Sequence, residues 1–316
     1  MNKRPALAAA LLLAVLAAAP AAATERAIWT WEQASYDMVQ DPVAGSAAIA
    51  FLQSKRIRTV YLYADAFNGQ NLLLSQPTRY RSFIARLHRR GLRAYALLGS
   101  AYLHTEEYVL PERRAVALAM FRRVLDYNAA VARDERFDGV NLDIEPHILD
   151  EWPEKKLRLL QQSLDLGQAL MDLKRASGQS MAVGPAMPFW LDGIQLEWHG
   201  VTKPASEHLL DVYDYAALMD YRDHAQGRDG IISNAVDEMA YADRHNKRLV
   251  IGIDVTPDEI QKVSFDHLSE RDLERELSLT AQAFRGRRAF AGFAIHHLRG
   301  YQAWLSRPAG RSAPTP

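Results

Sequence analysis

Eight short stretches of apolar or alternating residues recur along the chain, and helical segments separate most of them. The clearest helix follows the fourth stretch, where Leu157, Leu160, Leu164 and Met171 fall on one helical face. Eight strand–helix repeats in 316 residues predict an α/β fold, a single (β/α)₈ TIM barrel. A doubly wound open sheet is the alternative, but no Gly-rich loop follows the first strand. We predict strands at 27–31, 58–65, 93–99, 139–145, 181–187, 215–221, 249–255 and 292–297.

Residues 1–23 have the pattern of a cleavable secretory signal peptide. Lys3 and Arg4 precede an apolar run at 6–18, and the alanines at 21–23 offer a small-residue cleavage site. We therefore expect a periplasmic or secreted protein with no membrane anchor after cleavage. The chain has no Cys, so its barrel, at residues 24–305, has no disulfide. Residues 306–316, rich in Pro, Ser and Ala, are expected to form a disordered tail.

Charge narrows the range of partners. The 38 basic and 38 acidic residues balance, and no basic stripe is visible, so we do not expect a nucleic-acid partner. No heptad pattern or long amphipathic seam predicts an obligate partner chain, and the oligomeric state stays open.

A row of polar residues distinguishes the fourth strand. Asn141, Asp143 and Glu145 alternate with apolar residues, so they share one face of the strand. In a (β/α)₈ barrel the active site lies at the carboxyl ends of the strands. Two close carboxyl groups also raise one another's pKa, which keeps one of them protonated for acid catalysis. We favour this catalytic interpretation over a polar filling of the barrel or a salt bridge to a helix.

The other strand ends supply aromatic and carboxylate residues and few cations. Carboxylates perform acid–base chemistry on glycosidic bonds, and flat aromatic rings pack against sugar faces. The sequence therefore predicts a polysaccharide or oligosaccharide substrate. The candidate substrate-binding residues are Asn141, Trp29, Trp31, Tyr63, Asp65, His147, Trp190, Asp220, Asp254 and His296, and Tyr221 joins Asp143 and Glu145 as a catalytic candidate.

Several of these candidates also have a structural interpretation. Asn141 is expected to be a buried amide with satisfied hydrogen bonds. Tyr221 suits core packing as well as substrate contact, and Asp220 has the opposite strand parity. Asp254 could cap a loop, and each Trp could belong to the core. The histidines at 147, 296 and 297 match no compact metal motif, so we predict no metal and no cofactor, and we expect His296 to hydrogen-bond the substrate.

Two motifs resemble those of a known family. Residues 138–145 resemble the fourth-strand signature of the chitinase-like glycosidases, glycoside hydrolase family 18, which is Asp-x-x-Asp-x-Asp-x-Glu. Residues 219–221, Met-Asp-Tyr, resemble the family's Met-x-Tyr motif. Asn141 replaces the middle Asp, the third strand lacks the family's Ser-x-Gly-Gly ending, and the eighth strand ends in His296-His297, where the family commonly has Trp. The resemblance is that of a distant relative.

The resemblance implies a role for each matching residue. Glu145 would be the general acid that protonates the leaving oxygen. Asp143 would orient the substrate's acetamido group, which itself attacks the anomeric carbon, and Tyr221 would hydrogen-bond to that group. Asn141 cannot share a proton with Asp143 as an Asp could, and this alters the tuning of the pair.

Three functions remain open at this point. The first is a secreted or periplasmic glycoside hydrolase that cleaves an amino-sugar polysaccharide, with Glu145 as the acid. The second is a carbohydrate-binding barrel that has lost hydrolysis, and the third is a metal-dependent hydrolase. The sequence does not specify the sugar, the linkage, or cleavage within or at the end of the polymer.

Overall fold

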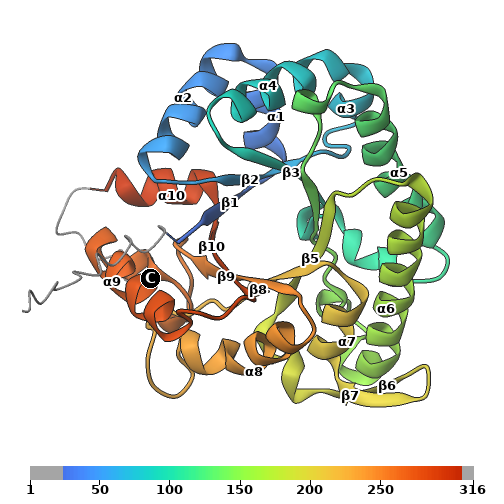
Figure 1. The fold of residues 1–316 in the computed structure, drawn as a ribbon, viewed down its shortest axis with the longest axis vertical. Coiled ribbons are helices and arrows are strands. Elements are labelled where there is room, and N and C mark those ends of the chain that lie inside the picture. The colour runs from blue at the N-terminus through green and yellow to red at the C-terminus, as the bar shows by residue number, and fades with distance from the viewer. Residues whose placement is uncertain (1–23, 308–316) are drawn as a thin grey trace, which may run out of the picture.

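Eight parallel strands close into a barrel in the computed structural model, which describes residues 24–307 (Figure 1). Neighbouring strands follow the order of the chain, and the last strand pairs with the first to close the barrel. This confirms the predicted (β/α)₈ barrel, whereas the predicted signal peptide and residues 308–316 of the predicted tail lie outside the described residues. The strands are β1 (Arg26–Thr30), β2 (Thr59–Tyr63), β3 (Arg93–Leu98), β4 (Gly139–Leu142), β5 (Ala182–Pro188), β8 (Tyr215–Met219), β9 (Arg248–Asp254) and β10 (Phe290–His296).

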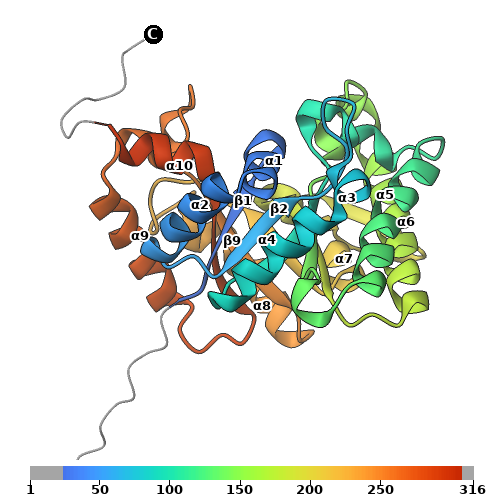
Figure 2. The ribbon, with the colours of Figure 1, turned by 90° about the horizontal axis from the view of Figure 1, so that it is seen from above.

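Helices form a ring around these strands, and Figure 2 shows α2 and α4 covering the outer side of β1 and β2. No helix within residues 24–307 is both long and apolar enough to cross a membrane. The helices are α1 (Glu32–Gln40), α2 (Pro42–Ser54), α3 (Leu72–Ser75), α4 (Pro77–Arg89), α5 (Arg114–Ala130), α6 (Trp152–Ser177), α7 (Ala205–Val212), α8 (Ile231–Arg244), α9 (Glu270–Ala283) and α10 (Leu298–Leu305).

Helix α6 shows how closely the apolar pattern predicts burial. Leu160, Leu164 and Met171 are buried against the barrel as expected. Leu157, which we placed on the same face, is 47% exposed. Lys155 interrupts the first turn of the helix with non-helical backbone angles (φ −119°, ψ 15°). The expected face of the helix therefore becomes regular only after this irregular first turn.

Large aromatic side chains fill the barrel below its open end. Trp29, Tyr61, Tyr95 and Tyr215 contact one another in sequence, with ring centroids 5.2, 5.9 and 5.8 Å apart. Gly184 provides the space for one of them, because a Cβ atom there would lie 2.7 Å from the Tyr215 ring. The interior is thus a packed core, as (β/α)₈ barrels require. Trp29 belongs to this core and is only 1% exposed, so its ring is not available as a sugar platform.

Two features differ from the sequence-based prediction. Strand β4 ends at Leu142, so Asp143 and Glu145 lie on the irregular segment that follows it. The crossover after β5, for which we expected only a helix at 205–210, also contains an antiparallel hairpin of β6 (Gln195–Trp198) and β7 (Val201–Pro204). Its two-residue turn uses positive φ at His199 and Gly200 (51° and 79°), as tight hairpins do.

Candidate active site

The polar row of the fourth strand begins deep in the barrel with Asn141. This residue is fully buried, and its Oδ1 accepts a hydrogen bond of 2.8 Å from Trp29 Nε1. Its Nδ2 donates to the Tyr215 hydroxyl at 3.3 Å and to the Gly184 carbonyl at 3.4 Å. Asn141 is therefore the satisfied buried amide that we expected, with partners in the core rather than Asp143.

Asp143 is positioned by the end of the neighbouring strand β3. Its backbone N–H donates to the Leu98 carbonyl at 2.7 Å. Gly99 has a φ of +96°, and a Cβ atom on it would lie 2.3 Å from the Asp143 carbonyl oxygen. Only Gly permits both this backbone conformation and this close approach. The sequence Leu98-Gly99 thus determines where the Asp143 side chain begins.

Asp143 and Glu145 form a pair of carboxyl groups with unusual proton affinity. Asp143 is 5% exposed. Burial raises the pKa of Asp143 well above its usual range, and the charges of Glu145 and Glu32 raise it further. Burial also raises the pKa of Glu145, where the charge of His296 acts in the lowering direction and that of Glu106 in the raising direction. The pair therefore favours a state that carries a proton, as a general acid must.

Tyr221 follows β8 and faces the same opening. Its ring lies 5.7 Å from that of His296, centroid to centroid. Burial raises the pKa of the Tyr221 hydroxyl well above its usual value, and the charges of Asp254, Glu145 and Asp143 add to this. The hydroxyl therefore remains a hydrogen-bond donor at physiological pH.

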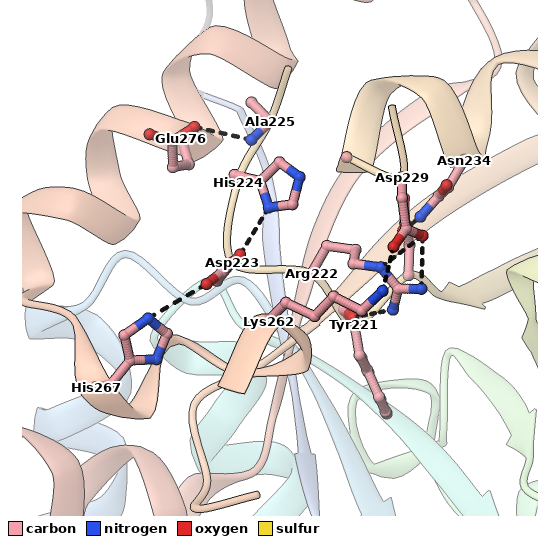
Figure 3. Close-up of polar contacts among 12 residues, drawn as sticks. Tyr221, Arg222, Asp223, His224, Ala225, Asp229, Asn234, Lys262, His267 and Glu276 are labelled. Atoms are coloured by element: carbon pink, nitrogen blue, oxygen red, sulfur yellow. Dashed lines mark hydrogen bonds and ion pairs between the residues drawn. The ribbon is translucent and has the colours of Figure 1, made fainter. Parts of the chain in front are cut away.

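The loop after Tyr221 is fastened by ion pairs (Figure 3). Arg222 donates to the Tyr221 carbonyl at 2.7 Å and pairs with Asp229, also at 2.7 Å. Lys262 of the β9–α9 connection holds the other Asp229 oxygen at 2.6 Å. The Arg222 guanidinium also lies over the Phe189 ring, 4.7 Å from its centroid. These contacts join three loops and fix the backbone that carries Tyr221.

A second cluster fastens the same loop further along (Figure 3). Asp223 lies between two imidazoles, 2.7 Å from His224 Nδ1 and 3.2 Å from His267 Nε2. The Ala225 N–H donates to Glu276 of α9 at 2.8 Å. The β8–α8 loop is thus attached both to the β9–α9 connection and to α9 itself.

His296 lies between Trp31 and Asp254. Trp31 Nε1 donates to His296 Nε2 at 3.1 Å, and His296 Nδ1 lies 3.4 Å from Asp254 Oδ1. Asp254 also accepts 2.8 Å hydrogen bonds from the Thr256 N–H and hydroxyl, so it caps the following loop. Trp31 therefore occupies Nε2 of His296, whereas Nδ1 has no hydrogen-bond partner among the described residues. A hydrogen bond from Nε2 to substrate would require Trp31 to move.

His147 lies beside Glu145 among aromatic rings. Its Nε2 is 3.2 Å from Glu145 Oε2. Its ring meets Trp190 edge-on at 5.3 Å, and Trp152 at 6.1 Å. Burial lowers the pKa of His147 to about 4, so the imidazole is neutral at physiological pH and does not compete for the proton of Glu145. Trp152 was not among the sequence candidates.

Three predicted substrate-binding residues are bound to the scaffold instead. Asp65 pairs with Arg123 of α5. Tyr63 is 1% exposed, and its hydroxyl donates to the Ala66 carbonyl at 2.9 Å. Asp220 is fully buried and accepts from Asn234 Nδ2 at 2.9 Å, which agrees with its opposite parity. Burial raises the pKa of Asp220 to about 8.

Two carboxylates near the pair were missed by the sequence analysis. Glu32 begins α1 directly after Trp31, and Glu106 lies in a 3₁₀ turn, Thr105–Val109, that follows β3. Inspection one residue beyond the tip of the first strand would have found Glu32. Glu106 lies in a long connection and carries no comparable sequence signal.

The arrangement of His, Asp and Glu side chains also bears on a metal site. Within residues 24–307, no group of three or more His, Asp or Glu side chains is arranged to hold a metal ion.

Comparison with known proteins identifies the fold. No protein-family profile matches the chain, and no curated protein matches it. A chitinase from Bacteroides thetaiotaomicron aligns with a TM-score of 0.54 and 12% identity over 88% of this chain and 90% of that one. A GH18 chitinase from Cycas revoluta, solved in complex with (GlcNAc)3, aligns with a TM-score of 0.51 and 14% identity over 89% and 97%. The chain thus shares its fold with these two chitinases, at low sequence identity.

Proposed function

We propose that the protein is a glycoside hydrolase that cleaves an amino-sugar polysaccharide, with Glu145 as the general acid. The chitinase-like fold supports the class of enzyme, and the Cycas revoluta neighbour bound to (GlcNAc)3 supports an N-acetylated oligosaccharide. The observation that carries the proposal is the Asp143–Glu145 pair beyond the end of β4, because burial raises the pKa of both carboxyl groups.

The geometry suits a mechanism assisted by the substrate. Glu145 would donate its proton to the glycosidic oxygen as the bond to the anomeric carbon breaks. The acetamido oxygen of the same sugar would attack that carbon, while Asp143 and the Tyr221 hydroxyl hold the acetamido group. Glu145, now ionised, would then take a proton from the water that opens the cyclic intermediate.

The leader-like residues 1–23 support action in the periplasm or outside the cell. Fractionation of cells that express the full chain tests this location. Recovery of the uncleaved chain in the cytoplasm would contradict it.

The assignment of Glu145 as the general acid is tested by comparing the wild type with Glu145→Gln. The measurement is the release of reducing ends from a panel of polysaccharides. The panel holds chitin oligosaccharides, deacetylated glucosamine and galactosamine polymers, and peptidoglycan glycan. We expect the variant to lose about 100-fold or more in rate and to keep sugar binding. Glu107→Gln, at a partly exposed carboxylate paired with Arg113, is the matched control. A Glu145→Gln protein that hydrolyses at the wild-type rate would show that the acid is assigned wrongly.

The second candidate function is a carbohydrate-binding barrel without hydrolysis. Asn141 favours it, because its amide is hydrogen-bonded within the core and cannot exchange a proton with Asp143. Wild-type protein that binds members of the panel and releases no reducing ends from any of them would support this candidate.

A further inference from the structure

Glu32 and Glu106 are buried carboxylates on two sides of the Asp143–Glu145 pair. Each is 7% exposed. Glu32 lies on the β1 side, and its charge acts on Asp143. Glu106 lies on the β3 side next to Thr105, whose hydroxyl is 3.5 Å from the Asp143 carbonyl oxygen, and its charge acts on Glu145. Four carboxyl groups, which follow β1, β3 and β4, therefore lie at the same end of the barrel.

These carboxylates lack the partners that buried charges normally have. Glu32 Oε1 and Glu106 Oε2 are inaccessible to solvent and have no hydrogen-bond partner among the described residues. Across residues 24–307, no Lys or Arg pairs with any of the four carboxyl groups, and the only ion-pair contacts are with His104 and His147. An unpaired buried charge is destabilising unless a ligand completes its hydrogen bonds. A cation with N–H donors would supply the partner that these two oxygens lack.

We propose that Glu32 and Glu106 form an acidic lining that binds the protonated amine of a deacetylated amino sugar beside the sugar that is cleaved. This inference rests on the proposed function and names its substrate class, a partly deacetylated amino-sugar polymer. An ammonium group supplies both the positive charge and several N–H donors, which match two unpartnered carboxylate oxygens. A fully acetylated polymer supplies neither charge nor as many donors.

The test compares two ligands of equal length, a fully acetylated chitopentaose and a chitopentaose that carries free amines on defined sugars. Calorimetric titration at pH 6 uses the Glu145→Gln protein, so that the ligands are not consumed. We expect the amine-bearing ligand to bind at least about tenfold more tightly, as a charged hydrogen bond predicts. Addition of Glu32→Gln or Glu106→Gln should remove most of that preference. It should also disappear at a pH where the amine is uncharged.

Controls separate this inference from the proposed function. Glu107→Gln, next to Glu106, and Asp37→Asn, on the same helix as Glu32, are the matched variants and should keep the preference. Equal affinity for the two ligands, or an unchanged preference in both glutamine variants, would overturn the acidic lining. If wild type hydrolyses the acetylated ligand without any amine preference, the lining fails and the glycosidase stands. If amine-selective binding occurs without hydrolysis of any substrate, the lining stands and the glycosidase fails.

Discussion

Asn141 shows how one side chain affects both the core and the site above it. Its amide accepts from Trp29 and also donates to the Gly184 carbonyl and the Tyr215 hydroxyl. A carboxylate at this position could accept from Trp29, but it would offer the Gly184 carbonyl a donor only when protonated. The Asn found here therefore avoids a further buried acid below Asp143 and Glu145.

Asn141→Asp is expected to lower the free energy of unfolding more at pH 8 than at pH 5. The new carboxyl is buried, so its folded-state pKa is raised, and the folded state loses stability as pH rises towards that value. We expect a loss on the order of 1–3 kcal/mol at pH 8. Urea unfolding at the two pH values measures it, with the exposed Asn246→Asp as the control. An equal loss at both pH values would contradict this account of Asn141.

At the scale of elements, the end of β3 is as important as β4 itself. Gly99 permits the Asp143 backbone to approach the end of β3. Its positive φ would strain any residue other than Gly. The polar row that begins on the fourth strand therefore needs a compatible neighbour, and here the Gly at the end of the third strand supplies it.

Gly99→Ala is expected to reduce both stability and hydrolysis. The strain of positive φ costs about 1 kcal/mol or more, and the contact with Asp143 displaces that residue. Displacement of a group that positions the substrate is expected to lower the rate about tenfold or more. Gly178→Ala is the matched control, because Gly178 also has positive φ (67°) but a Cβ there would meet nothing within 4 Å. Comparable activity in the two variants would show that Gly99 does not position Asp143.

The sequence predicted elements better than it predicted their ends. Alternation along 139–145 led us to group Asn141, Asp143 and Glu145, although the strand itself ends at Leu142 and only the Asp143 N–H extends its hydrogen bonds to β3. The β6–β7 hairpin was missed because its strands have four residues each and a His-Gly turn, a weaker signal than Asn-Gly. Short, partly exposed strands carry little apolar pattern from which to predict them.

At the scale of the whole molecule, the site depends on contacts that no local pattern contains. Residues at strand ends could be predicted because a closed barrel brings all such ends together. Glu106 could not, because the path of its loop decides whether it reaches Glu145. Nor could burial be predicted residue by residue: Trp29 and Tyr63 lie at strand ends and yet are covered by the core.

Burial of acids away from the site gives the whole molecule a pH dependence. Burial raises the pKa of Asp220 and of Glu238 to about 8, so between pH 6.5 and 8 the folded state binds more protons than the unfolded state. The free energy of unfolding must therefore fall as pH rises through this window. His147 and His297 act oppositely, because burial lowers the pKa of each to about 4, but most of their effect lies below about pH 6.5 and the remainder offsets only a small part of the loss.

We therefore expect wild-type protein to lose stability on the order of 2–4 kcal/mol between pH 6.5 and 8, since each acid contributes up to about 1.4 kcal/mol per pH unit. Urea unfolding at half-unit intervals measures the loss. The double variant Asp220→Asn, Glu238→Gln keeps the shape of both side chains but removes both titrating carboxyl groups. Most of the pH dependence of the free energy of unfolding should therefore disappear. Asp143 and Glu145, whose pKa values burial also raises, would account for a remaining slope. A wild-type profile that is flat or rises across this window would mean that water or a rearranged partner solvates Asp220 and Glu238.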